Sequence, residues 1–144
     1  RPIALKSNVC LHLSAGATLI ASPRKADYFP IGYNHNEMGD VYSAIFALEQ
    51  ENITIKGEGT LHLNGSSFYH MDKPSLVTTV GPEITQEYID EAPRTYDWRV
   101  NQPIFFHKCK NIRFEGLTIL DAPCWTISSR CRNSRSCMPT WRRC

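Results

Sequence analysis

Residues 52–63 decide the fold, and they read Asn52-Ile53-Thr54-Ile55-Lys56-Gly57-Glu58-Gly59-Thr60-Leu61-His62-Leu63. Apolar and polar side chains alternate on both sides of a glycine pair, which is the period of a β-strand, a turn and a second β-strand. The leading asparagine suits a turn, because its short amide bonds local backbone and tolerates a positive φ. The stretch therefore predicts two short strands joined by a tight turn.

The same phrase occurs twice more in the chain. Asn8-Val9-Cys10-Leu11-His12-Leu13 leads through Gly16 to Thr18-Leu19-Ile20, and Asn111-Ile112-Arg113-Phe114-Glu115-Gly116 leads into Leu117-Thr118-Ile119-Leu120. Such short strands cannot bury a face alone, whereas stacked coils bury a continuous apolar column. The repeat predicts an all-β chain folded as a right-handed parallel β-helix. A β-sandwich also has short strands and glycine turns, but it predicts varied turn chemistry rather than one recurring phrase.

The repeat also predicts which side chains stack. Matching positions place Val9, Ile53 and Ile112 in one column, and Leu11, Ile55 and Phe114 in a second column. The asparagines that begin the strands can form a ladder between coils at the strand spacing.

Two longer segments separate the repeats. Segment 22–48 begins as a loop and ends in an apolar run at 41–48 that predicts another strand. Segment 66–102 is rich in acidic and aromatic side chains, and residues 83–91 within it could form a short helix. Long excursions on one side of a solenoid commonly form the walls of its binding face.

Composition excludes several classes of protein. The chain has 144 residues, 42% hydrophobic and 21% charged, as in a soluble globular domain, and no apolar run approaches the roughly 20 residues of a membrane span. Residues 1–6 lack an initiating Met and a signal-peptide core, so they indicate the middle of a longer protein or a processed end. The compartment stays open, with a secreted or periplasmic location favoured over a cytoplasmic one.

Basic residues are concentrated in the tail, where segment 128–144 carries five arginines and no acid. The rest of the chain shows no basic stripe with interleaved aromatics, so we expect no nucleic-acid partner.

The six cysteines are Cys10, Cys109, Cys124, Cys131, Cys137 and Cys144. No CxxC pair occurs, and the scattered spacing favours isolated thiols over a disulfide framework or a zinc site. His12 and His62 hold matching positions that suggest outward-facing residues of one sheet, but a third ligand is missing. We expect no metal site.

Four phrases in order resemble landmarks of the polygalacturonase family of glycoside hydrolases (family 28). They are residues 2–9 with 15–19, residues 52–60 with Asn64-Gly65, Pro103–Phe106 with Cys109–Ile112, and Leu117–Ile119 with Ala122–Ile127. The match covers residues 1–127 and is loose over 66–102. The resemblance implies hydrolysis of pectic polysaccharide (galacturonan) with inversion at the anomeric carbon, and no cofactor.

The catalytic phrases of that family are absent from this chain. Inversion uses a carboxylic acid and a carboxylate on opposite faces of the sugar. The family supplies them in Asn-Thr-Asp and Asp-Asp phrases, followed by Gly-His-Gly and Arg-Ile-Lys, and none of the four occurs here. The chain is therefore expected to be an inactive N-terminal portion with no catalytic residue. Asp121 is the one acid next to a coil landmark, and it has no acidic neighbour after it.

Trp125 is the single candidate for a substrate contact. It either closes the coil as a core residue or lies beside a sugar site.

We expect two regions, a partial β-helix domain at 1–127 and an aberrant tail at 128–144, which contains no Val, Ile or Leu. Our hypothesis for the tail is a reading-frame error or cloning scar; the alternative is a natural disordered cap.

Two other functions stay open for the β-helix. One is a non-catalytic carbohydrate-binding or adhesive protein. The other is a lyase, which would need Ca²⁺ and a basic catalytic side chain.

Overall fold

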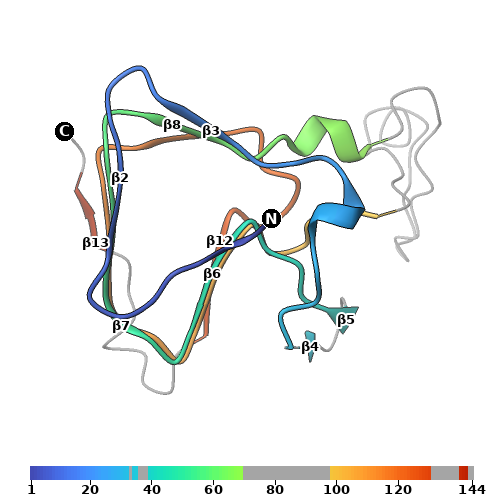
Figure 1. Cartoon of the computed structure of the whole chain (residues 1–144), viewed down its shortest axis with the longest axis horizontal. Coiled ribbons are helices and arrows are strands. Elements are labelled where there is room, and N and C mark those ends of the chain that lie inside the picture. The colour runs from blue at the N-terminus through green and yellow to red at the C-terminus, as the bar shows by residue number, and fades with distance from the viewer. Residues whose placement is uncertain (33, 36–38, 70–97, 131–139, 143–144) are drawn as a thin grey trace, which may run out of the picture.

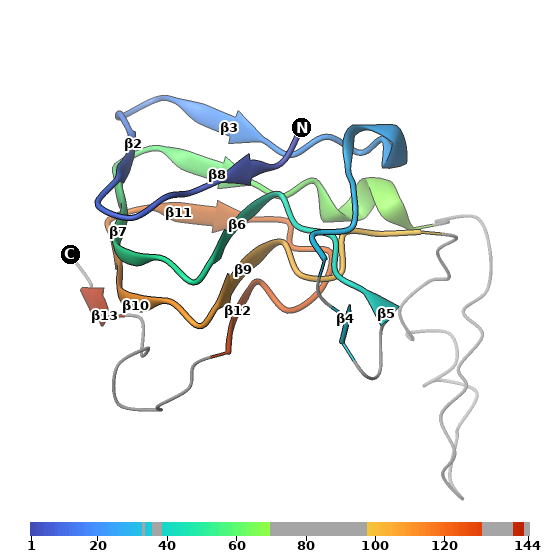
Figure 2. The same ribbon diagram turned by 60° about the horizontal axis from the view of Figure 1, so that its bottom comes forward.

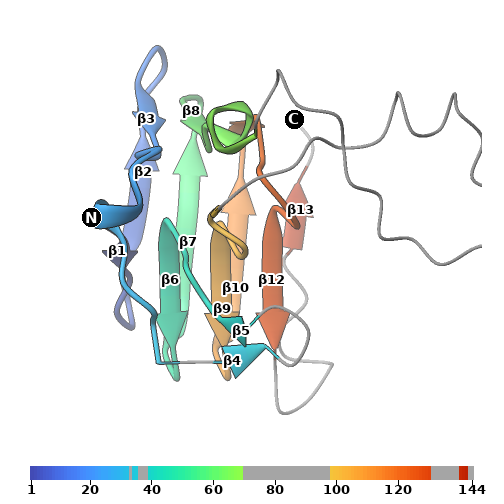
Figure 3. The same cartoon turned by 90° about the vertical axis from the view of Figure 1, so that its right-hand side faces the viewer.

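A computed structural model describes residues 1–32, 34–35, 39–69, 98–130 and 140–142. Its strands wind into three-sided coils, and matching strands of successive coils lie side by side (Figures 1 and 3). Every pairing between coils is parallel, so the expected parallel β-helix is confirmed, and the antiparallel packing of a β-sandwich is not what the chain adopts.

Three parallel sheets form the three sides. The first sheet holds β1 (Ile3–Ala4), β6 (Ile45–Leu48), β9 (Ile104–His107) and β12 (Ile127–Arg130). The second sheet holds β2 (Cys10–Leu13), β7 (Glu51–Gly57), β10 (Lys110–Glu115) and β13 (Thr140–Arg142). The third sheet holds β3 (Thr18–Ile20), β8 (Thr60–His62) and β11 (Thr118–Leu120). An antiparallel pair, β4 (Asn34–His35) and β5 (Gly39–Asp40), and two 3₁₀ segments, η1 (Lys25–Asp27) and η2 (Gly65–Phe68), lie outside the coils.

The predicted apolar columns are confirmed by the strand register. Ile112 pairs with Ile53, and Phe114 pairs with Ile55, which also pairs with Leu11. Val9 continues the first column, since its carbonyl accepts a 3.0 Å hydrogen bond from Thr54. Both Ile53 and Ile55 are 0% exposed, so the two columns are fully buried at the middle coil.

A second apolar cluster lies outside the first sheet. Ile31 and Val41, from the connection after β3, pack with Phe105 of β9, and Phe46 and Leu48 of β6 contact the cluster. The sequence did not predict this cluster, because residues 22–40 have loop composition. The strand expected at 41–48 is confined to β6, since Val41 is buried in this second cluster instead.

The positions of His12 and His62 correct one expectation. His12 belongs to β2 of the second sheet and His62 to β8 of the third, so the two imidazoles do not share a sheet. The register gives the reason: His12, in the first strand of its repeat, pairs with Lys56 of β7, whereas His62, in the second strand of its repeat, pairs with Ile20 of β3.

Several expectations concern the remaining segments. The short helix at 83–91 lies outside the described residues, as do Cys131, Cys137 and Cys144. Cys10 is exposed, Cys109 is buried and Cys124 is half-buried. The boundary at residue 127 stays a prediction; β12 crosses it to pair with β9, and β13 pairs with β10. In the described part of the chain, no helix is long and apolar enough to cross a membrane.

Candidate functional site

The three connections from the third sheet to the first all leave the coils at one corner, between those two sheets. Segments 21–44, 63–103 and 121–126 run from β3 to β6, from β8 to β9 and from β11 to β12 (Figure 1). Side chains far apart in sequence therefore meet at this corner, which we call the corner site. It is the place where excursions from a solenoid can form the wall of a binding face.

Asp121 and Ser66 join two of these connections. The Asp121 carboxylate accepts hydrogen bonds from the Ser66 amide, at 2.9 and 3.1 Å, and from the Ser66 hydroxyl at 2.9 Å. The Gly65 amide donates to the Asp121 carbonyl at 2.7 Å. A Cβ on Gly65 would lie 2.6 Å from that carbonyl and from the Pro123 nitrogen, so only glycine permits this approach of the two backbones.

Tyr69 and Arg99 converge on the carbonyl of Pro123. The Tyr69 hydroxyl donates to it at 2.5 Å, and Arg99 Nη1 donates to it at 2.9 Å and to the Tyr69 hydroxyl at 2.7 Å. Tyr69 and Arg99, which lie 30 residues apart in the sequence, therefore meet at the same corner of the coil.

An aromatic cluster surrounds Trp98. Its ring lies 5.4 Å from that of Tyr28, 5.5 Å from that of Tyr42 and 5.5 Å from that of Phe68, at tilted or edge-on angles. Tyr28 and Tyr42 come from the connection between β3 and β6, and Phe68 and Trp98 from the connection between β8 and β9. Such aromatic pairs stabilise beyond the area they bury. The cluster therefore packs the connections against one another.

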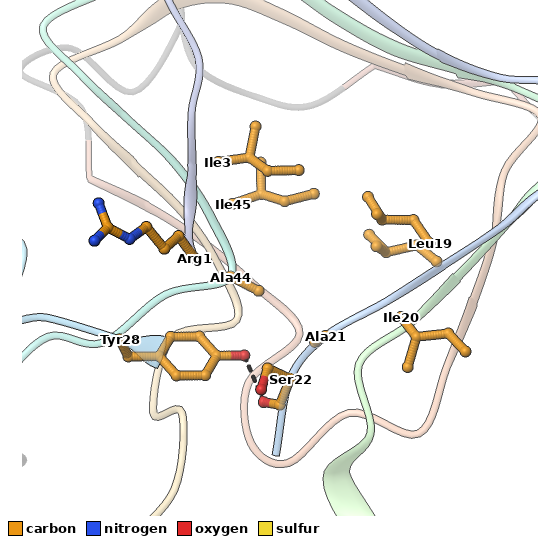
Figure 4. A pocket seen from close by; sticks show the side chains of 10 residues that line it. Arg1, Ile3, Leu19, Ile20, Ala21, Ser22, Tyr28, Ala44 and Ile45 are labelled. Carbon is orange, nitrogen blue, oxygen red and sulfur yellow. Dashed lines mark hydrogen bonds between the residues drawn. The ribbon is translucent and has the colours of Figure 1, made fainter. Parts of the chain in front are cut away.

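Tyr28 also borders a small hollow at the first coil, about 120 Å³ in volume and lined by Leu19, Ile20 and Ile45 among others (Figure 4). Its hydroxyl donates a 2.7 Å hydrogen bond to the Ser22 carbonyl. Burial, and to a lesser extent the charge of Asp27, raises the pKa of Tyr28 to about 12. The group is therefore held neutral as a hydrogen-bond donor.

Four acids near the coils have identified partners. The Ser22 hydroxyl donates to Asp27, and this bond, with help from Arg24, lowers the pKa of Asp27 against the opposing effect of burial. Glu49 lies 2.9 Å from Lys108, and Glu115 lies 3.6 Å from Arg113. Asp121 is bound to Ser66, so each of these four carboxylates contacts a serine or a cation. Inverting hydrolysis needs two carboxyl groups about 6.5–9.5 Å apart across the sugar.

No group of three His, Cys, Asp or Glu side chains among the described residues could hold a metal ion. Cys109 is buried beneath the first sheet, and burial raises the pKa of its thiol.

Trp125 lies apart from these hydrogen bonds, at one end of the apolar interior. Its side chain is 55% exposed and borders an open hollow of about 670 Å³, together with Leu117, Ile119 and Ile127. Those three residues also pack against the main core. The structure thus places the predicted substrate contact beside the end of an aliphatic column.

Sequence reasoning singled out Asp121 but missed Ser66, Tyr69 and Arg99. Their partners lie 55, 54 and 24 residues away, and no local pattern marks such contacts. The glycine of Asn64-Gly65-Ser66 was the one available signal, because a glycine outside a strand can mark a close backbone approach.

No protein-family model matches the sequence, and no curated protein matches it. Two solved structures match most of the chain. A candidate glycosyl hydrolase from Parabacteroides merdae is 21% identical with a TM-score of 0.55, covering 89% of this chain and 53% of that one. A hyperthermoactive exopolygalacturonase from Thermotoga maritima is 24% identical with a TM-score of 0.59, covering 89% of this chain and 33% of that one.

Likeness at this identity establishes the fold, so the chain is a parallel β-helix protein. It spans about half and about a third of the lengths of the two proteins it matches.

Proposed function

We propose that this chain is the N-terminal portion of a glycoside hydrolase that acts on pectic polysaccharide by inverting, polygalacturonase-type hydrolysis of galacturonan. The observation that carries the proposal is the parallel β-helix itself, which the chain has in common with a candidate glycosyl hydrolase and an exopolygalacturonase. The four phrases that resemble the polygalacturonase family, in the same order along the sequence, support the proposal independently of the fold.

The catalytic carboxylates lie, in this proposal, outside residues 1–144. Asp27, Glu49, Glu115 and Asp121 are engaged with serine or cationic side chains, which positions loops and strands rather than a proton donor and a water. General acid–base catalysis needs side chains within hydrogen-bond reach of the glycosidic oxygen and the attacking water.

Trp125 is proposed as a substrate contact of the longer protein. Its ring is exposed and flanked by the hydroxyl-bearing residues Thr126 and Ser128. An exposed aromatic ring of this kind offers an apolar face to a ligand.

The test is the release of reducing ends from polygalacturonate. Purified chain 1–144 is expected to release none, whereas a polypeptide extended through the Asn-Thr-Asp, Asp-Asp and Gly-His-Gly phrases is expected to hydrolyse the polymer. Release by the 144-residue chain that Asp121→Asn abolishes would overturn the placement of the catalytic groups.

A non-catalytic carbohydrate-binding β-helix is the second candidate, favoured by the exposed rings of Trp125 and Phe29, which are 55% and 48% exposed. An extended polypeptide that binds pectic polysaccharide without hydrolysing it, and that lacks the acidic phrases over several further coils, would establish this alternative.

A further inference from the structure

His62 lies in the middle coil, where both edges of its strand are paired. β8 has β3 of the first coil on one side and β11 of the third coil on the other, and His62 is in register with Ile20 and Leu120 (Figures 2 and 3). Its side chain is half-buried. The surroundings of His62 are therefore formed by coils on both sides of it rather than by an end of the solenoid.

The imidazole of His62 bonds to the turn that follows its own strand. Its Nδ1 accepts a 3.2 Å hydrogen bond from the Asn64 amide, two residues further along the chain. A neutral imidazole that accepts at Nδ1 carries its proton on Nε2. An imidazolium donates at both nitrogens, so protonation of His62 would set a second N–H against the Asn64 amide and remove the bond.

Asn64 begins the turn that leads from β8 to the corner site. It adopts a left-handed conformation with a φ of 55°, and its side-chain amide donates a 3.2 Å hydrogen bond to the Ala21 carbonyl of the first coil. The next two residues reach the third coil, where the Gly65 amide bonds to the Asp121 carbonyl. The Ser66 amide and hydroxyl bond to the carboxylate of the same aspartate. This turn therefore links all three coils.

The strands beside His62 present no charge to it. Ile20 and Leu120, its register neighbours, are aliphatic, and η2, which follows the turn, contains no ionisable side chain. Asp27 and Asp121 are the first acids after β3 and β11, and both are engaged in the hydrogen bonds described above. Carboxyl groups titrate at about pH 4, below the range of roughly pH 5–8 in which histidine changes its charge.

We propose that His62 is a pH-sensitive latch of the corner site. In its neutral form the imidazole holds the Asn64 amide, and with it the turn that joins the three coils. In its charged form it releases that amide, so the hydrogen bonds of the turn to Ala21 and Asp121 open more often. The corner site is thereby fixed at neutral pH and loosened in mild acid, and the change reverses when the proton leaves, as in other histidine switches.

Amide hydrogen exchange tests the latch on the 144-residue chain. Protection factors, which correct for the intrinsic pH dependence of exchange, are compared at about pH 8 and about pH 5, on either side of the histidine range. Those of the Asn64 and Ser66 amides are expected to fall about three- to tenfold in acid, the effect of losing one hydrogen bond. The amides of Ile53 and Ile55, in the core strand β7, are expected to keep their protection.

Two substitutions of His62 separate its charge from its hydrogen bond. His62→Asn keeps a neutral acceptor in the place of Nδ1 and is expected to make the protection of Asn64 and Ser66 independent of pH. His62→Leu removes the acceptor and is expected to give the low protection at both pH values. His12→Asn is the matched control, because His12 is exposed on β2 of a different sheet, and it should leave the pH dependence unchanged.

Four results would each overturn the proposal. They are equal protection of Asn64 and Ser66 at both pH values, an equal fall in His62→Asn, full protection in His62→Leu, and a fall shared by β7, which would indicate global unfolding. Hydrolysis is measured in none of these experiments, so their outcome is independent of the proposed function.

Discussion

The side-chain amide of Asn52 donates a 2.9 Å hydrogen bond to the Asn8 side-chain carbonyl, which links the first two coils at the turn that precedes each strand. Asn111 repeats the contact from the third coil, donating to Asn52 at 2.8 Å. All three residues have positive φ, at 63°, 58° and 52° in chain order. The expected asparagine ladder is thus confirmed, and each member combines a left-handed turn with a link to the next coil.

Replacing Asn52 separates these two roles. We expect Asn52→Ala to lower the free energy of unfolding by about 1–3 kcal/mol, because it removes two hydrogen bonds and leaves the left-handed conformation to a residue without the short polar side chain that favours it. Asn52→Gly removes the same bonds without the steric penalty and should cost less. Urea unfolding of the two variants tests this, and an equal or larger loss for glycine would contradict it.

The Leu11–Ile55–Phe114 column should be the most sensitive part of the core. Ile55→Ala removes a side chain that is 0% exposed and is expected to cost about 2–5 kcal/mol in unfolding free energy. Leu120→Ala is the matched control, because Leu120 is 46% exposed and its truncation should stay within about 0.5 kcal/mol. Similar losses for both would show that the column is not the packed core.

The Ser66–Asp121 contact should couple two connections energetically. A double-mutant cycle with Ser66→Ala and Asp121→Ala is expected to give a coupling energy of about 0.5–1.5 kcal/mol for the bond between the Ser66 hydroxyl and the Asp121 carboxylate, since either substitution removes that bond. Thermal unfolding of the four proteins measures it. Additive effects of the two substitutions would mean that the contact does not join the connections.

Alkaline stability should depend on Tyr28. Its pKa of about 12 in the folded chain lies above the usual value near 10, so the folded state holds the proton more tightly than the unfolded state. The resulting stability is fully present below pH 10 and is lost as the pH rises through 12. Tyr28→Phe should flatten the fall in urea midpoint between pH 9 and 12, whereas Tyr42→Phe should retain it. Parallel curves for Tyr28→Phe and the unsubstituted chain would refute the assignment.

The sequence by itself determined the coil. Alternation in Ile53-Thr54-Ile55 sets which side chains face inward, because a strand turns successive residues to opposite faces, and each leading asparagine sets a left-handed turn through its own short side chain. Both effects act within a few residues, and their repetition along the chain was enough to predict parallel stacking and the columns through Ile53 and Ile55.

Only the tertiary structure decided the corner site and the second apolar cluster. Ser66 meets Asp121, and Tyr69 meets Arg99 and Pro123, because the long connections return to one corner of stacked coils. Ile31 and Val41 likewise become core residues only where their loop crosses Phe105. These contacts depend on the path of whole segments across the coil surface, and that path is set by long-range packing for which a local sequence pattern carries no signal.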